Sequence, residues 1–265
     1  MKFLCSLVLT LVVLTNCSAQ NSTPIFKYDP GRLPLHQAQV YIKSNLDGSH
    51  ASFVAVYLKE KDRIESFKWT EGNTEGTLVK AKMDWRRFSV SHFEGGRVNA
   101  NGELNIRAQL SVPGGKNKAE VQIGGSEPSS VILKHFPWHS YDFDFASLGI
   151  VMSQKVAPAS TIEFMISDIA GEANGPVFKE IGKVSMKKEE REEKFGSQCQ
   201  RYHIDGPGLD DRGGKIWFDK QGRLVGLEIQ KPDEPGFVSN KLRRIEVLKL
   251  SAEEWESFKK QKLQN

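Results

Sequence analysis

Residues 104–112 read LNIRAQLSV, and this stretch decides the fold class. Apolar and polar residues alternate along it, and a period of two predicts a strand with one buried face, as in an antiparallel sheet. The apolar face carries Leu104, Ile106, Ala108, Leu110 and Val112. The preceding Asn101-Gly102 suits a type I′ turn, because both residues tolerate positive φ. Residues 97–112 are therefore predicted to form a hairpin.

The same period recurs along most of the chain. Residues 51–69 are predicted as strand, charged turn and strand, and residues 216–229 as a second hairpin about Gly222. Glycine-containing turns recur about every ten residues, and this spacing of short strands is typical of a sandwich or barrel. No alternation of strands with helices is visible, so a parallel sheet is not expected.

Two stretches have helical character. Ser251 and Glu254 form a capping box, and Trp255 and Phe258 share one face, which predicts a helix over 252–262 docked by its two aromatics. Residues 145–152, FASLGIVM, are continuously apolar. They fit a buried helix or a central strand, and periodicity does not decide between the two.

The N-terminus has the pattern of an export signal. Lys2 precedes an apolar stretch that is too short to span a bilayer comfortably. Residues 14–17, Leu-Thr-Asn-Cys, resemble the bacterial lipoprotein box, which implies a signal peptide over 1–16 and acylation of Cys17. Asn16 departs from the small residue usual at its position, and cleavage after Ala19 is the alternative, which would give a soluble secreted protein.

The rest of the chain is expected to divide into three segments that suit a lipoprotein. We expect a lipid-anchored tether over 17–35, rich in Asn, Ser and Pro, an antiparallel β domain over 36–250 and the helix within 251–265. The expected location is the outer membrane, or a membrane-anchored position facing the periplasm, because Ser18 is not the Asp that retains enterobacterial lipoproteins at the inner membrane.

Composition limits the functional classes. The 265 residues contain 37 Lys and Arg against 33 Asp and Glu, and a net charge of +4 is too weak to indicate nucleic-acid binding. The 15 Phe and 5 Trp are enough for a core, so the chain is not disordered. After processing Cys199 has no partner for an internal disulfide, and we interpret it as a small, half-buried strand residue.

The sequence shows no convincing catalytic or metal motif. His135 and His139 have the spacing of a zinc helix, but Pro137 would break that helix, so both are interpreted as loop residues. Asp142 and Asp144 are interpreted as solvent-side strand residues, or as a helix N-cap in the case of Asp144. The Asp- and Gly-rich residues 205–214 are interpreted as a long hairpin connection, and the charge run 186–195 as a solvated hairpin or short helix. We expect no enzymatic activity, metal or cofactor.

The second half resembles an exported family of unknown function whose members end in a similar Trp-containing hairpin. The motifs are Tyr141-Asp-Phe143 before the apolar run, residues 196–202 (GSQCQRY), Ile216-Trp-Phe-Asp219 and residues 224–229 (LVGLEI). The resemblance covers about residues 136–250, and that family is similar to the periplasmic lipoprotein carrier and its outer-membrane receptor. It implies a curved antiparallel sheet or half-barrel around an apolar cavity, and no catalytic residues.

These observations predict a mainly β protein, a curved antiparallel sheet or half-barrel with a C-terminal helix. The first functional hypothesis is a non-enzymatic envelope lipoprotein, anchored through its acylated Cys17, that binds an apolar or lipid-like ligand inside the curved sheet. The expected lining residues are Leu104, Ile106, Leu110, Phe143, Phe145, Ile162, Phe164, Trp217, Val225 and Leu227. They fill the core in the alternative interpretation.

Two other hypotheses stay open at this stage. The chain could be an interaction or assembly module that binds other envelope proteins through a sheet edge or exposed aromatics. It could also be a hydrolase of envelope polymer, with Asp142 and Asp144, or Asp210 and Asp211, as acid and base. Facing carboxylates across a cleft would favour the hydrolase.

Overall fold

The computed structural model describes residues 29–264, except for 86, 114–116, 155–159, 170–176 and 233–235. Cys17, the predicted signal peptide and most of the predicted tether lie outside the described residues. The chain is described from a short 3-10 turn, η1 (Pro30–Arg32), after which Leu33 is buried in the core.

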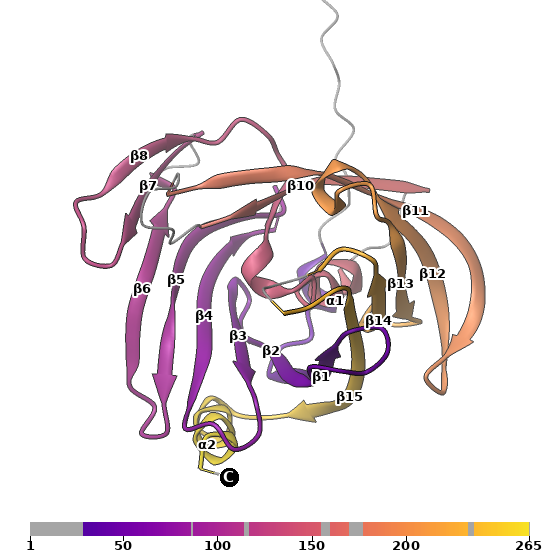
Figure 1. Ribbon diagram of the computed structural model, residues 1–265, viewed down its shortest axis with the longest axis horizontal. Coiled ribbons are helices and arrows are strands. Elements are labelled where there is room, and N and C mark those ends of the chain that lie inside the picture. Colours follow the sequence, from indigo (N-terminus) through magenta and orange to yellow (C-terminus); the bar gives the residue numbers. More distant parts are fainter. Residues whose placement is uncertain are drawn as a thin grey trace, which may run out of the picture.

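One large curved sheet forms most of the described chain (Figure 1). Its order is β8-β7-β6-β5-β4-β3-β2-β1-β15-β14-β13-β12-β11-β10-β9, so that the first and last strands pair in its middle. Neighbours are antiparallel except β9 and β10, which are parallel. The strands are β1 (Gln37–Ser44), β2 (Ser52–Glu60), β3 (Arg63–Trp69), β4 (Glu75–Asp84), β5 (Ser89–Asn99), β6 (Leu104–Ser111), β7 (Lys118–Ile123), β8 (Ser129–Ile132), β9 (Trp138–Ser140), β10 (Thr161–Asp168), β11 (Lys179–Lys194), β12 (Ser197–Asp205), β13 (Gly214–Asp219), β14 (Leu224–Ile229) and β15 (Asn240–Lys249). The predicted fold class, a curved antiparallel sheet with a C-terminal helix, is confirmed.

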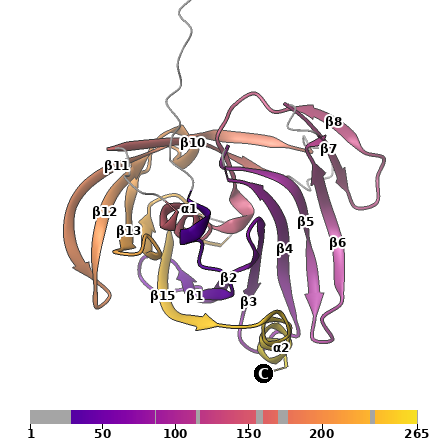
Figure 2. The same ribbon diagram turned by 180° about the vertical axis from the view of Figure 1, so that it is seen from behind.

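The sheet rolls up without closing into a barrel. Strand β9 ends the sheet on one side, yet its Trp138 backbone N–H donates to Ser89 Oγ of β5 at 3.4 Å. Strands β6 to β8 continue beyond this meeting point (Figures 1 and 2). The roll therefore has a concave inner face and a convex outer face.

Residues 136–154 cross the inside of the roll and fill much of it. They contain a 3-10 turn, η3 (Tyr141–Phe143), and helix α1 (Leu148–Ser153), which lies within the curve of the sheet (Figure 2). The ambiguous FASLGIVM stretch is thus a turn followed by a short buried helix. Its Phe145, Leu148 and Ile150 are at most 1% exposed and join one apolar cluster with residues from strands on both sides of the roll.

Helix α2 (Ala252–Lys262) covers the convex face, as its capping box and aromatic pair predicted. Trp255 is fully buried and stacks on Tyr57 at 4.9 Å between ring centroids, while Phe258 is half-buried against Trp69. Both hydrogen bonds of the Ser251–Glu254 capping box are present. Neither described α-helix has the length and hydropathy needed to cross a membrane.

A β-bulge corrects the expected face of residues 104–112. Gly95 lies opposite Ala108 but Gly96 lies opposite Ile106, so Arg107 has no partner on β5 and the alternation changes face there. Leu104 consequently contacts the Trp255 cluster on the convex face and Ile106 is 41% exposed, whereas Leu110 is in the inner core. A Cβ on Gly96 would collide with the Asn105 carbonyl, so the glycine is what permits the close approach of β5 to the bulge.

Candidate functional site

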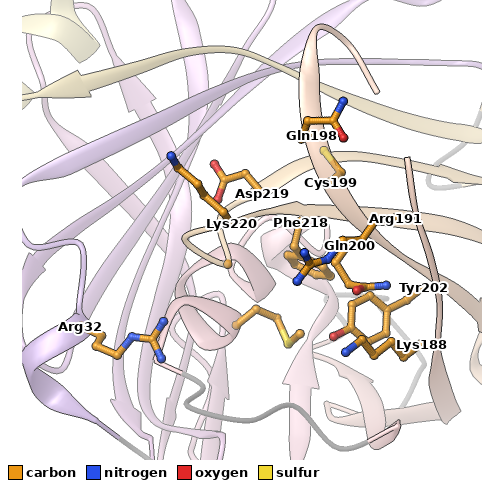
Figure 3. Close-up of a pocket in the computed structure, with 12 residues that line it drawn as sticks. Arg32, Lys188, Arg191, Gln198, Cys199, Gln200, Tyr202, Phe218, Asp219 and Lys220 are labelled. Atoms are coloured by element: carbon orange, nitrogen blue, oxygen red, sulfur yellow. The ribbon is translucent and has the colours of Figure 1, made fainter. Parts of the chain in front are cut away.

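The candidate site is a pocket of about 540 Å³ beside strands β11, β12 and β13 (Figure 3). It lies between the concave face of these strands, helix α1 and the turn η1. Its lining residues are Arg32, Met152, Lys188, Arg191, Gln198, Cys199, Gln200, Tyr202, Phe218, Asp219, Lys220 and Gly222.

Strand register brings the pocket side chains to one face. Lys188 lies opposite Tyr202, Arg191 opposite Gln200, and Gln200 in turn opposite Phe218. Cross-strand partners point to the same side of a sheet, and Tyr202 and Phe218 belong to the inner core. Lys188 and Arg191 therefore project from the concave face.

A bulge in β11 makes this arrangement possible. Residues three apart on a regular strand point to opposite faces, but the register shifts between Lys188 and Arg191. The Gln200 side-chain amide donates to the backbone carbonyl of Glu189 within the bulge and to that of Arg201 at 3.0 Å. The extra residue returns Arg191 to the face of Lys188.

The floor of the pocket is aromatic and apolar. Tyr202 meets Phe218 edge-on, with ring centroids 5.7 Å apart, and Met152 of α1 contributes a thioether. Burial raises the pKa of the Tyr202 phenol to about 12, so this ring stays neutral at any physiological pH. Figure 3 shows Lys188 next to Tyr202, with Arg32 on the other side of the pocket.

The lining carries four cations, Arg32, Lys188, Arg191 and Lys220, against one carboxylate. That carboxylate, Asp219, is already bound by two further arginines, Arg223 at 2.9 Å and Arg244 at 3.0 Å. The pocket thus combines an apolar floor with a positively charged wall.

None of the ten residues expected from the sequence lines this pocket. Six of them belong to the inner core, namely Leu110, Phe143, Phe145, Ile162, Phe164 and Leu227. The other four lie elsewhere: Leu104 and Ile106 beyond the bulge in β6, and Trp217 and Val225 with Cys199 in a small cluster apart from the inner core. Any role of these ten residues in ligand binding stays a prediction.

The carboxylates considered for catalysis are not solvent-side strand residues. Asp144 is 1% exposed and forms ion pairs with Lys43 at 3.2 Å and Lys68 at 2.6 Å. Burial raises the pKa of its carboxyl, but the two lysines outweigh burial and hold that pKa below its usual value. These charges tie residues 136–154 to β1 and β3, which corrects the solvent-side and N-cap interpretations.

Asp142 is half-buried in the turn η3 and accepts a hydrogen bond from Ser140 Oγ at 2.6 Å. Burial, with a contribution from the nearby charge of Asp168, raises its pKa to about 6. Asp210 and Asp211 lie in an exposed turn, where Lys231 pairs with Asp210 at 3.2 Å. Neither Asp142 with Asp144 nor Asp210 with Asp211 lines the pocket, so this geometry lends the hydrolase hypothesis no support.

The two histidines differ in environment. His139 is buried, stacks on Phe145 at 5.6 Å, and its Nδ1 lies 3.2 Å from Ser147 Oγ. Burial lowers the pKa of His139 to about 3, so the ring is neutral. His135 is exposed beside Glu180 at 3.2 Å. Within the described residues no three His, Cys, Asp or Glu side chains are grouped as a metal site.

Cys199 is buried at 2% exposure, and its thiol donates to the Ser197 carbonyl at 3.3 Å. Burial also raises the pKa of this thiol, which disfavours the nucleophilic thiolate. His203, four residues later, is exposed and lies 3.7 Å from Asp205. Cys199 and His203 therefore do not form a catalytic pair.

Comparison with known proteins gives a likeness of fold only. No family model and no curated protein matches the chain. Among solved structures, the chain is similar to the β-barrel-like protein of domain of unknown function DUF1849 from Brucella abortus. The two are 9% identical with a TM-score of 0.49, over 83% of this chain and 100% of the other. A likeness at this level assigns neither ligand nor location.

Proposed function

We propose that the protein is an exported, non-enzymatic lipoprotein of the cell envelope that holds a lipid-like ligand in the pocket beside β11, β12 and β13. The single observation that carries this proposal is the pocket itself, about 540 Å³ with an aromatic floor on the concave face. Small-molecule sites commonly measure about 300–1,000 Å³ and are mostly apolar with a few polar groups.

The favourable free energy of binding would come from covering the apolar floor of the pocket. Each buried methylene contributes about 0.8 kcal/mol, so an alkyl chain that buries about six of them on Met152, Tyr202 and Phe218 gains about 5 kcal/mol. Acylation of Cys17 would keep the pocket close to a membrane, with the chain facing the periplasm. That anchor rests on the lipoprotein box of the sequence.

The test is mass spectrometry of protein purified from its native membrane. We expect an intact mass with acylated Cys17, and a co-purified lipid in the organic extract. The Lys188→Trp variant, whose indole would occupy the pocket, should lose that lipid. Lys187→Trp is the matched control, because Lys187 is exposed on the same strand outside the pocket lining. An unmodified chain that begins at Gln20 would overturn the proposed acylation of Cys17. Extracts without lipid would overturn the proposed lipid-like ligand.

A second candidate, an interaction module, is favoured by a groove on the convex face. It measures about 230 Å³ between strands β1 and β15 and helix α2. Trp69 stacks on Phe53 within it at 5.1 Å, and Ile245 on its wall is 45% exposed. An envelope protein that co-purifies at fixed stoichiometry and is lost in Ile245→Asp, but kept in Ile132→Asp on distant β8, would place this candidate first.

A further inference from the structure

We propose that the ligand of this pocket is an anionic amphiphile, whose phosphate or carboxylate headgroup binds Arg191 and Lys188 while its alkyl chain lies on Tyr202 and Phe218. This inference rests on the proposed function, since it names the chemical class of ligand for the same pocket. It is carried by the distribution of charge between the two faces of β11.

Three acidic residues of β11 form ion pairs on the face of the sheet away from the pocket. Arg201 of β12 forms ion pairs with Glu189 at 2.6 Å, with Glu192 at 2.7 Å and with Glu190. Glu192 also accepts a hydrogen bond from the indole N–H of Trp217, which belongs to the cluster apart from the inner core. Three carboxylates of the run 186–195 are thereby bound to one arginine that does not line the pocket.

Three of the four cations that line the pocket differ from Arg201 in this respect. Within the described part of the chain, none of Lys188, Arg191 and Lys220 forms an ion pair with a carboxylate, whereas Lys183, Lys194 and Arg201 nearby all do. Asp219 is bound by Arg223 and Arg244. Glu193, two residues beyond Arg191, is exposed and outside the pocket lining.

This geometry suits an acidic headgroup. A guanidinium presents a planar fork that binds a phosphate or carboxylate through two N–H groups, and an ammonium adds a compact point charge. Attraction between opposite charges is stronger beside a low-dielectric surface than in water. Tyr202 provides such a surface directly opposite Lys188, and Phe218 lies one strand further from Arg191, across Gln200.

The apolar floor separates an amphiphile from a free anion. A site for inorganic phosphate needs only the cations, and a floor of Met152, Tyr202 and Phe218 would contribute nothing to it. An alkyl phosphate uses both parts of the pocket. The two ligands share one headgroup chemistry, so a titration with matched probes tells them apart.

The experiment is isothermal titration of the full chain with dodecyl phosphate, dodecyl maltoside and inorganic phosphate, each below its micellar concentration where one exists. We expect dodecyl phosphate to bind at least about tenfold more tightly than dodecyl maltoside, and the difference to shrink in high salt. Lys188→Gln and Arg191→Gln should each weaken the binding of dodecyl phosphate by about tenfold. Lys187→Gln and Lys215→Gln, outside the pocket lining, should bind as the wild type does.

Each other result contradicts a defined part of the account. Equal binding of dodecyl phosphate and dodecyl maltoside, unchanged in both pocket variants, would overturn the acidic headgroup but keep a lipid-like ligand. Inorganic phosphate that binds as tightly as dodecyl phosphate would overturn the amphiphile. Absence of binding by all three probes to a chain with native circular dichroism would overturn the headgroup and, with it, the proposed function of the pocket.

Discussion

Individual charged residues hold residues 136–154 in place inside the roll. Asp144 stands in left-handed backbone geometry, with φ of 49°, and directs its carboxylate to Lys43 and Lys68. Lys43 is only 3% exposed, so the ion pair is removed from water. Removal of one partner of a buried pair is costly, because the remaining charge keeps its desolvation penalty.

We therefore expect Asp144→Asn to lower the free energy of unfolding by about 3–5 kcal/mol, measured by urea denaturation. The exposed Asp211→Asn is the control and should change it by less than about 0.5 kcal/mol. Equal stability of the two variants would mean that the lysines do not depend on Asp144.

Asp142 makes stability depend on pH with a defined sign. Its folded-state pKa of about 6 lies above the ordinary 3.8, so the folded chain binds this proton more tightly than the unfolded chain. The stabilisation is present below about pH 4 and is lost as pH rises through about 6. Relative to Asp142→Asn, the free energy of unfolding of the wild type should fall by about 1–3 kcal/mol between these limits, measured by denaturation at several pH values. A difference that is constant with pH would contradict the raised pKa.

At the scale of single elements, bulges decide which residues face the core. Alternation along residues 104–112 predicted the strand and its hairpin, and the structure contains both. It placed Ile106 and Leu110 on one face because a bulge leaves almost no trace in the pattern. The available signal was the pair Gly95-Gly96 on the partner strand, where the absence of side chains permits close approach. The bulge that brings Lys188 and Arg191 together lies in a uniformly charged run and had no apolar pattern to reveal it.

The bulge in β6 predicts unequal costs for two residues of one apparent stripe. Leu110→Ala should lower the free energy of unfolding by about 2–5 kcal/mol, because it leaves a cavity in the core. Ile106→Ser should cost less than about 1 kcal/mol, since its side chain is 41% exposed. Thermal or urea denaturation of both variants measures these costs. Similar costs would contradict the bulge and indicate a regular strand in which both residues face the core.

Helix α2 depends on Trp255 more than on Phe258. The Trp255 indole N–H donates to the buried Glu65 at 2.7 Å, and Lys259 binds the same carboxylate at 3.0 Å. Trp255→Ala should lower the free energy of unfolding by about 3–5 kcal/mol, through lost packing and the loss of one hydrogen bond to the buried Glu65 carboxylate. Phe258→Ala removes a half-buried ring and should cost less than half of that. A larger loss in Phe258→Ala would contradict this role of Glu65.

For the whole molecule, local sequence patterns predict the strands and the terminal helix, but they do not predict contacts between residues far apart in the sequence. Period two and turn spacing were sufficient for an antiparallel sheet, and the capping box for its terminal helix. The position of residues 136–154 inside the roll was not predictable, because it depends on Lys43 and Lys68 from strands far away in sequence. The ten apolar residues expected to line a cavity therefore lie mainly in filled core, and the pocket is confined to the side of β11, β12 and β13.

The proposed function requires that a lipid-like ligand lies in this pocket and not in the convex groove. Crosslinking with a photoreactive alkyl phosphate, which carries a diazirine on its chain, distinguishes the two sites when the crosslinks are mapped by peptide mass spectrometry. We expect crosslinks to peptides that contain Met152, Tyr202 and Phe218, and their loss in Lys188→Trp. Crosslinks concentrated on Phe53, Trp69 and Phe258 would contradict the claim and place the ligand on the convex face beneath helix α2.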